Sequence, residues 1–91
     1  MDLSLQSLTV IPIEDLIQLG KKLKRLDLSQ NQLTQIPERF GELVDLVELD
    51  LGNNGLAQLP ECFGFLFNLR KVSLDNNALT TLPESWINLV K

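Results

Sequence analysis

The sequence contains no histidine and no tyrosine among its 91 residues, and aromatic side chains make up only 5% of it. Histidine is the commonest general base and metal ligand, so its absence removes the usual centre of acid–base or metal chemistry. Cys62 is the single cysteine, which excludes a disulfide within the chain, and no Asn-x-Ser/Thr glycosylation acceptor occurs. These absences favour a reducing compartment, and we expect a cytoplasmic location.

Basic residues are also few. Eight lysines and arginines stand against 12 acidic residues, which gives a formal net charge of −4. Phosphate binding needs a basic stripe, so this charge disfavours nucleic acid as a partner. No stretch approaches the roughly 18 consecutive apolar residues of a membrane span. The N-terminal stretch, with Asp2 and no long apolar run, is not typical of a signal peptide. We therefore expect no membrane contact from these residues.

What the sequence does contain is leucine at regular intervals. Three blocks of 23 residues follow one another with the same pattern, at residues 23–45, 46–68 and 69–91. Equivalent positions in the three blocks are Leu28, Leu51 and Leu74; Asn31, Asn54 and Asn77; and Pro37, Pro60 and Pro83. A fixed period of this length indicates a solenoid, in which each coil buries its apolar face against its neighbours. Residues 1–22 are expected to form a degenerate N-terminal capping coil, with Leu3 and Leu5 matching Leu26 and Leu28.

Each block predicts a strand, a turn and a helical segment. Polar and apolar residues alternate in residues 25–29, which predicts a short strand that lies parallel to its equivalents in the stacked coils. The asparagine after each strand is expected to satisfy backbone groups of neighbouring coils and so to form a ladder. Residues 38–43 and their equivalents predict a short helical or 3-10 turn after the proline. In the first coil, residues 13–19 predict a short helix that ends at Gly20. Two buried columns are expected, formed by Phe40, Phe63 and Trp86 and by Leu43, Leu66 and Leu89.

The pattern Leu-x-x-Leu-x-Leu-x-x-Asn-x-Leu-x-x-Ile/Leu-Pro-x-x-Phe-Gly-x-Leu resembles that of leucine-rich repeats. Residues 23–91 contain three copies, with Val72 for leucine and Trp86-Ile87 for Phe-Gly as the departures. The 23-residue length and central Leu-Pro are similar to the intracellular class, which includes the Ras suppressor protein, Scribble-type scaffolds and plant Ras-group-related repeats. Residues 2–5 and 11–16 are also similar to the start of the leucine-rich domain in the ribosome-associated endoplasmic-reticulum protein of this superfamily.

The resemblance implies an α/β right-handed solenoid, with a short parallel sheet on the concave face and short helical or 3-10 turns on the convex face. It also implies that the concave face binds proteins, with no catalytic residue and no cofactor. We therefore expect a non-catalytic adaptor or regulatory scaffold in signal transduction. Two alternatives stay open: a recruitment or regulatory segment of a larger multidomain protein or enzyme, and a self-associating structural repeat unit.

The solvent side of the predicted sheet carries three columns of side chains that run across the strands. We place Asp2, Arg25, Glu48 and Lys71 in the first column; Ser4, Asp27, Asp50 and Ser73 in the second; and Gln6, Ser29, Gly52 and Asp75 in the third. Charges alternate in sign along the first column, which is typical of a self-paired, solvated surface. In the second column two aspartates are adjacent, and like charges directly opposite each other are destabilising. This cost suggests a protein partner with a basic segment, although carboxylates are also common on solvated strands. The candidate protein-binding residues are Arg25, Asp27, Ser29, Glu48, Asp50, Lys71, Ser73 and Asp75.

Paired carboxylates also occur in catalytic and metal sites. Asp27 and Asp50 on an open sheet lack an apolar pocket to shift a pKa and lack a lysine or histidine partner, so we predict no catalytic residue. Hard cations bind carboxylates, which leaves a loose calcium site as a weaker alternative, and we predict no metal. Cys62 shares a column with Arg39 and Ser85, so we expect it to face solvent without acting as a nucleophile.

Two further surfaces are candidates for contacts. Phe65 stands where other blocks carry Glu42 and Asn88, so it is either exposed on the convex side as a possible anchor for a partner or folded down onto its coil. In the last block, several apolar residues have no following coil: Leu69, Val72, Leu74, Leu79 and Leu82. We expect the face formed by residues 69–91 to make a homo-oligomeric contact or to continue into a longer solenoid.

Overall fold

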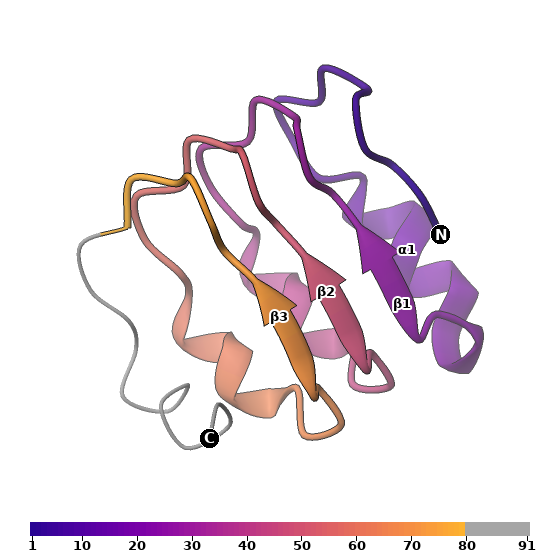
Figure 1. Ribbon diagram of the computed structural model, residues 1–91. Coiled ribbons are helices and arrows are strands. Elements are labelled where there is room, and N and C mark those ends of the chain that lie inside the picture. The colour runs from indigo at the N-terminus through magenta and orange to yellow at the C-terminus, as the bar shows by residue number, and fades with distance from the viewer. Residues whose placement is uncertain (80–91) are drawn as a thin grey trace.

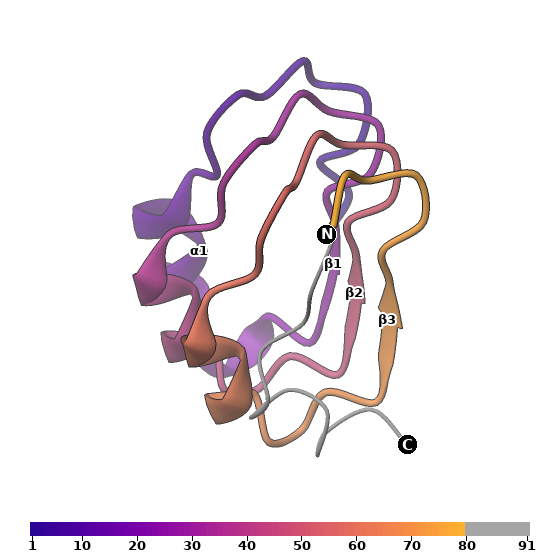
Figure 2. The same cartoon turned by 90° about the vertical axis from the view of Figure 1, so that its left-hand side faces the viewer.

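The computed structural model describes residues 1–79, and it shows coils of chain stacked side by side (Figure 1). Strands line one side of the stack, and helical segments line the opposite side (Figure 2). The elements in chain order are α1 (Ile13–Leu19), η1 (Gly20–Lys22), β1 (Arg25–Asp27), η2 (Glu38–Glu42), β2 (Glu48–Asp50), η3 (Glu61–Phe65) and β3 (Lys71–Ser73), where η denotes a 3-10 helix. None of the helices in this described part is long and apolar enough to cross a membrane.

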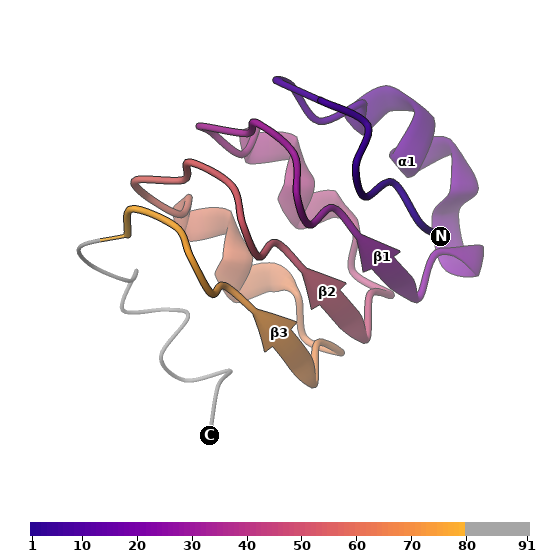
Figure 3. The ribbon, with the colours of Figure 1, turned by 45° about the horizontal axis from the view of Figure 1, so that its top comes forward.

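The strands form one parallel sheet in the order β1-β2-β3, as the repeat predicted (Figure 3). Arg25 pairs with Glu48, which in turn pairs with Lys71, and Asp27 pairs with Asp50 in the same register. Each strand has three residues instead of the predicted five, although backbone bonds between coils continue beyond it. The Leu28 N–H, for example, donates to the Asp50 carbonyl at 2.8 Å. The predicted register of the strands in the three regular coils is confirmed.

The predicted register of the first coil is wrong by two residues. Asp2 forms a bridge with Asp27, and the Leu3 N–H donates to the Asp27 carbonyl at 2.8 Å. Asp2 therefore lies opposite Asp27, and not opposite Arg25. Further along, the Leu5 N–H donates to the Ser29 carbonyl at 3.3 Å, which leaves the third column to Ser4 in place of Gln6. The cause is the longer helical segment formed by α1 and η1, which shifts every earlier residue relative to the next coil.

The asparagine ladder connects each turn to the coil before it. The Asn31 side-chain oxygen accepts from the Gln6 and Leu8 N–H groups at 3.0 Å each, and its amide donates to the Leu3 carbonyl at 3.0 Å. The same amide also donates to two carbonyls of its own coil. Asn54 and Asn77 repeat this arrangement one and two coils further on. Because these bonds hold backbone groups at the edge of the core, the ladder fixes the path of each turn.

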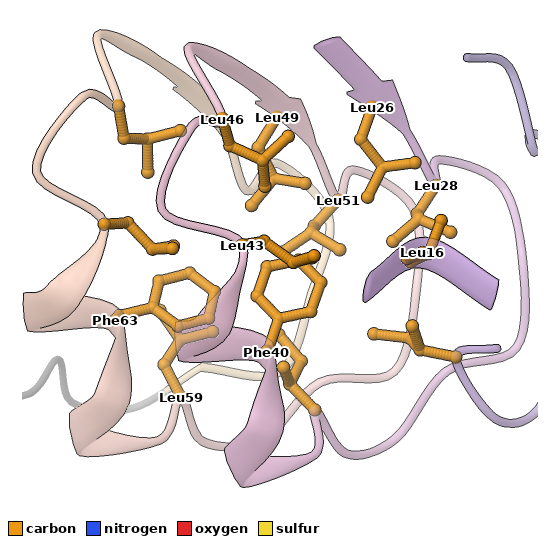
Figure 4. Close-up of a cluster of buried hydrophobic side chains, with 14 of the residues drawn as sticks. Leu16, Leu26, Leu28, Phe40, Leu43, Leu46, Leu49, Leu51, Leu59 and Phe63 are labelled. Atoms are coloured by element: carbon orange, nitrogen blue, oxygen red, sulfur yellow. The ribbon is translucent and has the colours of Figure 1, made fainter. Parts of the chain in front are cut away.

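The core lies between the sheet and the helical turns (Figure 4). Phe40 and Phe63 stack with their ring centroids 5.5 Å apart and their planes at 14°, as their shared column predicted. Leu43 and Leu66 are buried next to them. The matching residues of the last coil, Trp86 and Leu89, lie outside the described residues, as does Leu82.

The helical turns pack closely enough to require glycine at one position. A Cβ atom at Gly41 would lie 2.8 Å from the Cβ and 3.0 Å from the carbonyl oxygen of Cys62. Pro37 and Pro60 directly precede η2 and η3, which begin and end as the sequence predicted to within one residue. The turns η2 and η3 therefore lie in direct contact on the side of the stack opposite the strands.

Candidate protein-binding surface

The concave face contains a shallow depression of about 270 Å³, which is lined by Met1 and by all the residues of β1, β2 and β3. The strands present alternate side chains to it, so the first and third residue of each strand face the depression and the middle residue faces the core. Leu26 and Leu49 are 3% exposed and belong to the core. The charged side chains come from the positions that the sequence assigned to the first two columns.

One ion pair forms in the first column. Arg25 Nε lies 3.4 Å from Glu48 Oε2, and these side chains are 77% and 41% exposed. An exposed pair of this kind contributes about 0–1 kcal/mol to stability. Lys71, opposite Glu48 on the other side, is exposed and forms no ion pair with any residue in the range 1–79. The alternating column is therefore only partly self-paired.

The second column is a row of three carboxylates, one more than the sequence predicted. The register shift of the first coil brings Asp2 beside Asp27, and Asp50 follows. In each residue Oδ1 accepts the N–H two positions further on, from Ser4, Ser29 or Gly52, at 2.9 Å. The hydroxyl and then the N–H of Ser4 lower the pKa of Asp2 by these hydrogen bonds. Local donors therefore offset part of the repulsion between neighbouring aspartates.

The structure separates the candidate binding residues by exposure. Lys71, Asp75 and Arg25 are exposed, and the side chains of the other positions are half-buried, with one exception. Ser29 is only 7% exposed, and its hydroxyl donates to Asp27 Oδ1 at 2.6 Å. The prediction that Ser29 offers a contact on the solvent side is therefore wrong: its hydroxyl is already used within the coil. The sequence placed Asp2 opposite Arg25 and so left it out of the aspartate row, because the register of Asp2 depends on the length of α1 and η1.

No three acidic or cysteine side chains converge into a possible metal site anywhere in residues 1–79. The carboxylates of the second column instead lie in a line along the sheet, one per strand. Each turns Oδ1 toward its own coil. This arrangement provides hydrogen-bond acceptors to a molecule that lies across the strands, and it does not surround an ion.

Cys62 is half-buried against Gly41, so the prediction that it faces solvent is wrong. Burial raises the pKa of its thiol, which reduces the share of reactive thiolate near neutral pH. Arg39, from the same column, forms ion pairs with Glu14 and Glu42 on the surface. The difference arises because the cysteine side chain fills the contact between two stacked turns.

Phe65 is 59% exposed at the end of η3, which excludes the alternative that it folds down onto its coil. Phe67 is 71% exposed, and Val44, at the equivalent position of the preceding coil, is 40% exposed. At the far end of the stack, Leu69 is 6% exposed, and Val72, Leu74 and Leu79 are half-buried. Both surfaces stay predictions as contact sites, the second because most of its last coil lies outside the described residues.

The fold is an open α/β solenoid with a parallel sheet on its concave face and short helical turns on its convex face. Two family models match the sequence, one for leucine rich repeats in two copies at residues 21–62 and one for a single leucine rich repeat at residues 68–89. Together they account for more than half of the chain, which belongs to the leucine-rich repeat family.

A solved structure of a leucine-rich repeat protein from Leptospira interrogans is similar to this chain, with a TM-score of 0.64 and 25% sequence identity. The match covers 100% of this chain and 35% of that protein, so the chain spans about a third of its length. The search of curated protein sequences gave no match. Leucine-rich repeats are generally protein–protein interaction modules, and they are typically not enzymes. The resemblance to the intracellular class, and to one superfamily member in the first coil, stays a prediction.

Proposed function

We propose that the protein is a non-catalytic adaptor or regulatory scaffold of the cytoplasm, whose concave face binds a protein partner with a basic segment. The observation that carries this proposal is the row of aspartates Asp2, Asp27 and Asp50, of which Asp27 and Asp50 line the depression. Their Oδ1 atoms are bound within their own coils, and their Oδ2 atoms have no hydrogen-bond partner in residues 1–79. These free acceptors point to donors on a bound molecule.

The surface is held in place before any partner binds. Three strands in register and the asparagine ladder fix the backbone beneath the carboxylates. A preorganised surface loses little conformational entropy on binding, and this supports a role in presentation of a binding surface.

The size of the concave face favours a segment over a folded domain as the partner. Neighbouring strands lie about 4.8 Å apart, so the paired strands and the bridge at Asp2 span only roughly 15–20 Å. A standard interface needs about 800 Å² on each partner. An extended peptide segment can lie in a depression of this width, and a larger partner would have to reach beyond it.

The test is charge removal on the concave face. We expect Asp27→Asn combined with Asp50→Asn to weaken capture of partner proteins by about tenfold or more at low salt, since each lost charge-assisted hydrogen bond is worth about 1.5–3 kcal/mol. The matched control is Asp15→Asn with Glu38→Gln, which removes two exposed acids away from the concave face. Equal binding by both double variants would contradict the proposal.

A second candidate is a recruitment or regulatory segment of a larger protein, which the 35% coverage of the Leptospira protein favours. The mass of the protein isolated from its native source separates this candidate from the first. The third alternative, self-association through the face of residues 69–91, predicts a mass in light scattering that rises with concentration. A constant monomer mass at high concentration would argue against it.

A further inference from the structure

The edge of the stack at which the chain enters the strands carries most of the basic residues. It is formed by three turns, residues 20–25, 43–48 and 66–71, which lie along the lower edge of the view in Figure 2. These turns hold six of the eight lysines and arginines and only two of the 12 acidic residues. The six cations are Lys21, Lys22, Lys24, Arg25, Arg70 and Lys71. This strand-entry edge is therefore positive in a chain whose formal net charge is −4.

Hydrogen bonds hold the three turns side by side. The Val47 N–H donates to the Lys24 carbonyl at 2.7 Å, and the Arg70 N–H donates to the Val47 carbonyl at 2.8 Å. The Asn68 side-chain amide donates to the Val44 carbonyl at 2.9 Å. The edge therefore presents its side chains from a fixed row of backbone.

The cations of the strand-entry edge are exposed and mostly unpaired. Arg25 forms an ion pair with Glu48, and none of the other five cations pairs with an acidic residue in the range 1–79. The first turn also borders a hollow of about 490 Å³, whose lining mixes cationic and aliphatic side chains: Lys22, Lys24, Arg25, Met1, Leu19 and Leu23. Such a lining suits a ligand that joins an anionic headgroup to hydrocarbon.

Exposed apolar side chains stand on the same edge. Phe67 lies in the third turn, Phe65 lies directly before that turn, and Val44 lies in the second, and all three are exposed. Val44 and Phe67 occupy equivalent positions of adjacent coils, which the bond from Asn68 to the Val44 carbonyl holds together. Aromatic side chains combined with lysines and arginines are typical of protein surfaces that lie in the interface of a lipid bilayer.

The charge and the size of the edge select among possible partners. A two-fold contact with a second copy would bring like charges together, which is unfavourable. Two strand spacings of about 4.8 Å make the edge only roughly 10 Å long from the first turn to the third. A standard protein interface needs about 800 Å² on each partner. A bilayer surface has no such minimum, because each inserted apolar side chain and each cation near anionic headgroups contributes separately.

We propose that the strand-entry edge binds the surface of a membrane that contains anionic lipids. Phe65 and Phe67 insert between the headgroups, and the unpaired lysines lie beside the anionic groups of the lipids. The absence of a long apolar run predicted no membrane contact, but a contact within the interface needs no spanning segment, so we revise that prediction for this edge. The strands lie on another side of the stack, so this contact goes beyond the function proposed above and leaves the concave face open (Figure 2).

The test is flotation with vesicles of phosphatidylcholine alone and of an equimolar mixture of phosphatidylcholine and phosphatidylserine. At low salt we expect binding to the mixed vesicles to be at least about tenfold stronger than to the neutral ones, and to weaken as salt is added. The double variants Phe65→Ser with Phe67→Ser and Lys21→Gln with Lys24→Gln should each weaken binding to the mixed vesicles by about tenfold or more.

The matched controls change residues outside the edge. Val10 and Phe67 are both 71% exposed, so Val10→Ser removes an equally exposed apolar side chain. Gln32→Glu with Gln58→Glu lowers the net charge by as much as the lysine variant does, at two exposed positions. We expect both controls to bind the mixed vesicles within about twofold of the unmodified protein at 0.1 M salt, where charges farther apart than about 10 Å are screened. Urea unfolding of every variant verifies its fold.

Absence of binding to the mixed vesicles at low salt would overturn the inference. Equal losses in the edge variants and in the controls would also overturn it, because net charge or general surface hydrophobicity would then explain the binding. A titration with poly-L-glutamate tests an acidic protein segment in place of a membrane. Chemical-shift changes of the edge amides with this polymer, without binding to vesicles, would assign the edge to a protein partner. None of these variants alters the aspartate row, so each result leaves the proposed function intact.

Discussion

The first coil and the two that follow it share one side of their structure and differ on the other. On the strand side, the same bond recurs at each step: the Gln32 N–H donates to the Leu8 carbonyl at 2.8 Å, and the Gly55 N–H donates to the Leu33 carbonyl at 2.7 Å. On the convex side, the first coil has α1 and η1 where the others have five-residue 3-10 helices.

The difference shows which side of a coil tolerates a change of length. Backbone bonds between strands and turns require each residue to meet one partner, so an insertion there would break the register. The convex side is held by side chains such as Phe40 and Phe63, which pack without a fixed backbone register. The extra residues of the first coil are therefore found in its helical segment.

The first coil and the regular coils differ most in their turns. Asn31 and Gln6 occupy equivalent positions there but form very different hydrogen bonds. Asn31 is 8% exposed and bonds five backbone groups, whereas the Gln6 amide reaches one exposed carbonyl at 3.3 Å. We expect Asn31→Ala to lower the free energy of unfolding by about 3–5 kcal/mol, since buried groups lose their partners. Gln6→Ala should cost less than about 0.5 kcal/mol. Urea unfolding followed by circular dichroism measures both, and similar costs would remove the contrast between the turns.

Gly41 and Gly20 test how tightly the helical segments of a regular coil and of the first coil are packed. We expect Gly41→Ala to cost about 1–3 kcal/mol, because its Cβ would meet Cys62. The double variant with Cys62→Gly should lose less stability than the sum of the two single variants, which a double-mutant cycle measures. Gly20, in the first coil, has φ +54°, and a Cβ atom added there would have no neighbouring atom within 4 Å. Any stability that Gly20→Ala loses therefore comes from backbone strain alone. Full additivity of the Gly41 and Cys62 changes would contradict the contact.

The smallest expected effect has the opposite sign. Leu5 has φ +57° and is 70% exposed, while the equivalent residues Gln30, Asn53 and Asn76 have φ of 55°, 57° and 60°. Asparagine adopts this left-handed conformation at lower cost than leucine. We expect Leu5→Asn to raise the free energy of unfolding by about 0.5–1 kcal/mol and Asn53→Leu to lower it by a similar amount. A thermal melt of each variant measures these changes, and a loss of stability in Leu5→Asn would show that the side chain matters more than the backbone.

The regular coils could be predicted from the sequence because their period is constant. Once Leu26, Leu49 and Val72 are aligned, the strand pairing, the asparagine ladder and the stack of Phe40 on Phe63 follow. The first coil has no such guide: Leu3 and Leu5 alternate like Leu26 and Leu28, so a shift by two residues preserves the pattern of buried and exposed positions. Only the length of α1 with η1 resolves the register.

The candidate site could be predicted at the level of columns but not of single atoms. The sequence placed Asp27 beside Asp50 and Gly52 beside Ser29, and the register confirms both neighbours. It could not show that the Ser29 hydroxyl binds Asp27 while Asp50 lacks such a donor. This depends on the direction of a side chain after each strand, which periodicity does not determine. The half-burial of Cys62 was missed for a related reason, because it depends on the distance between stacked turns.

The asparagines of the ladder all reach backward along the chain. Asn54 accepts from Leu33 of the coil before it, and Asn77 accepts from Leu56, each at 3.1 Å. During synthesis on the ribosome, a turn therefore gains its full set of bonds only after the next turn has emerged. The bonds of the ladder are therefore completed from the N-terminal coil toward the C-terminal one, and each new asparagine stabilises the turn made before it.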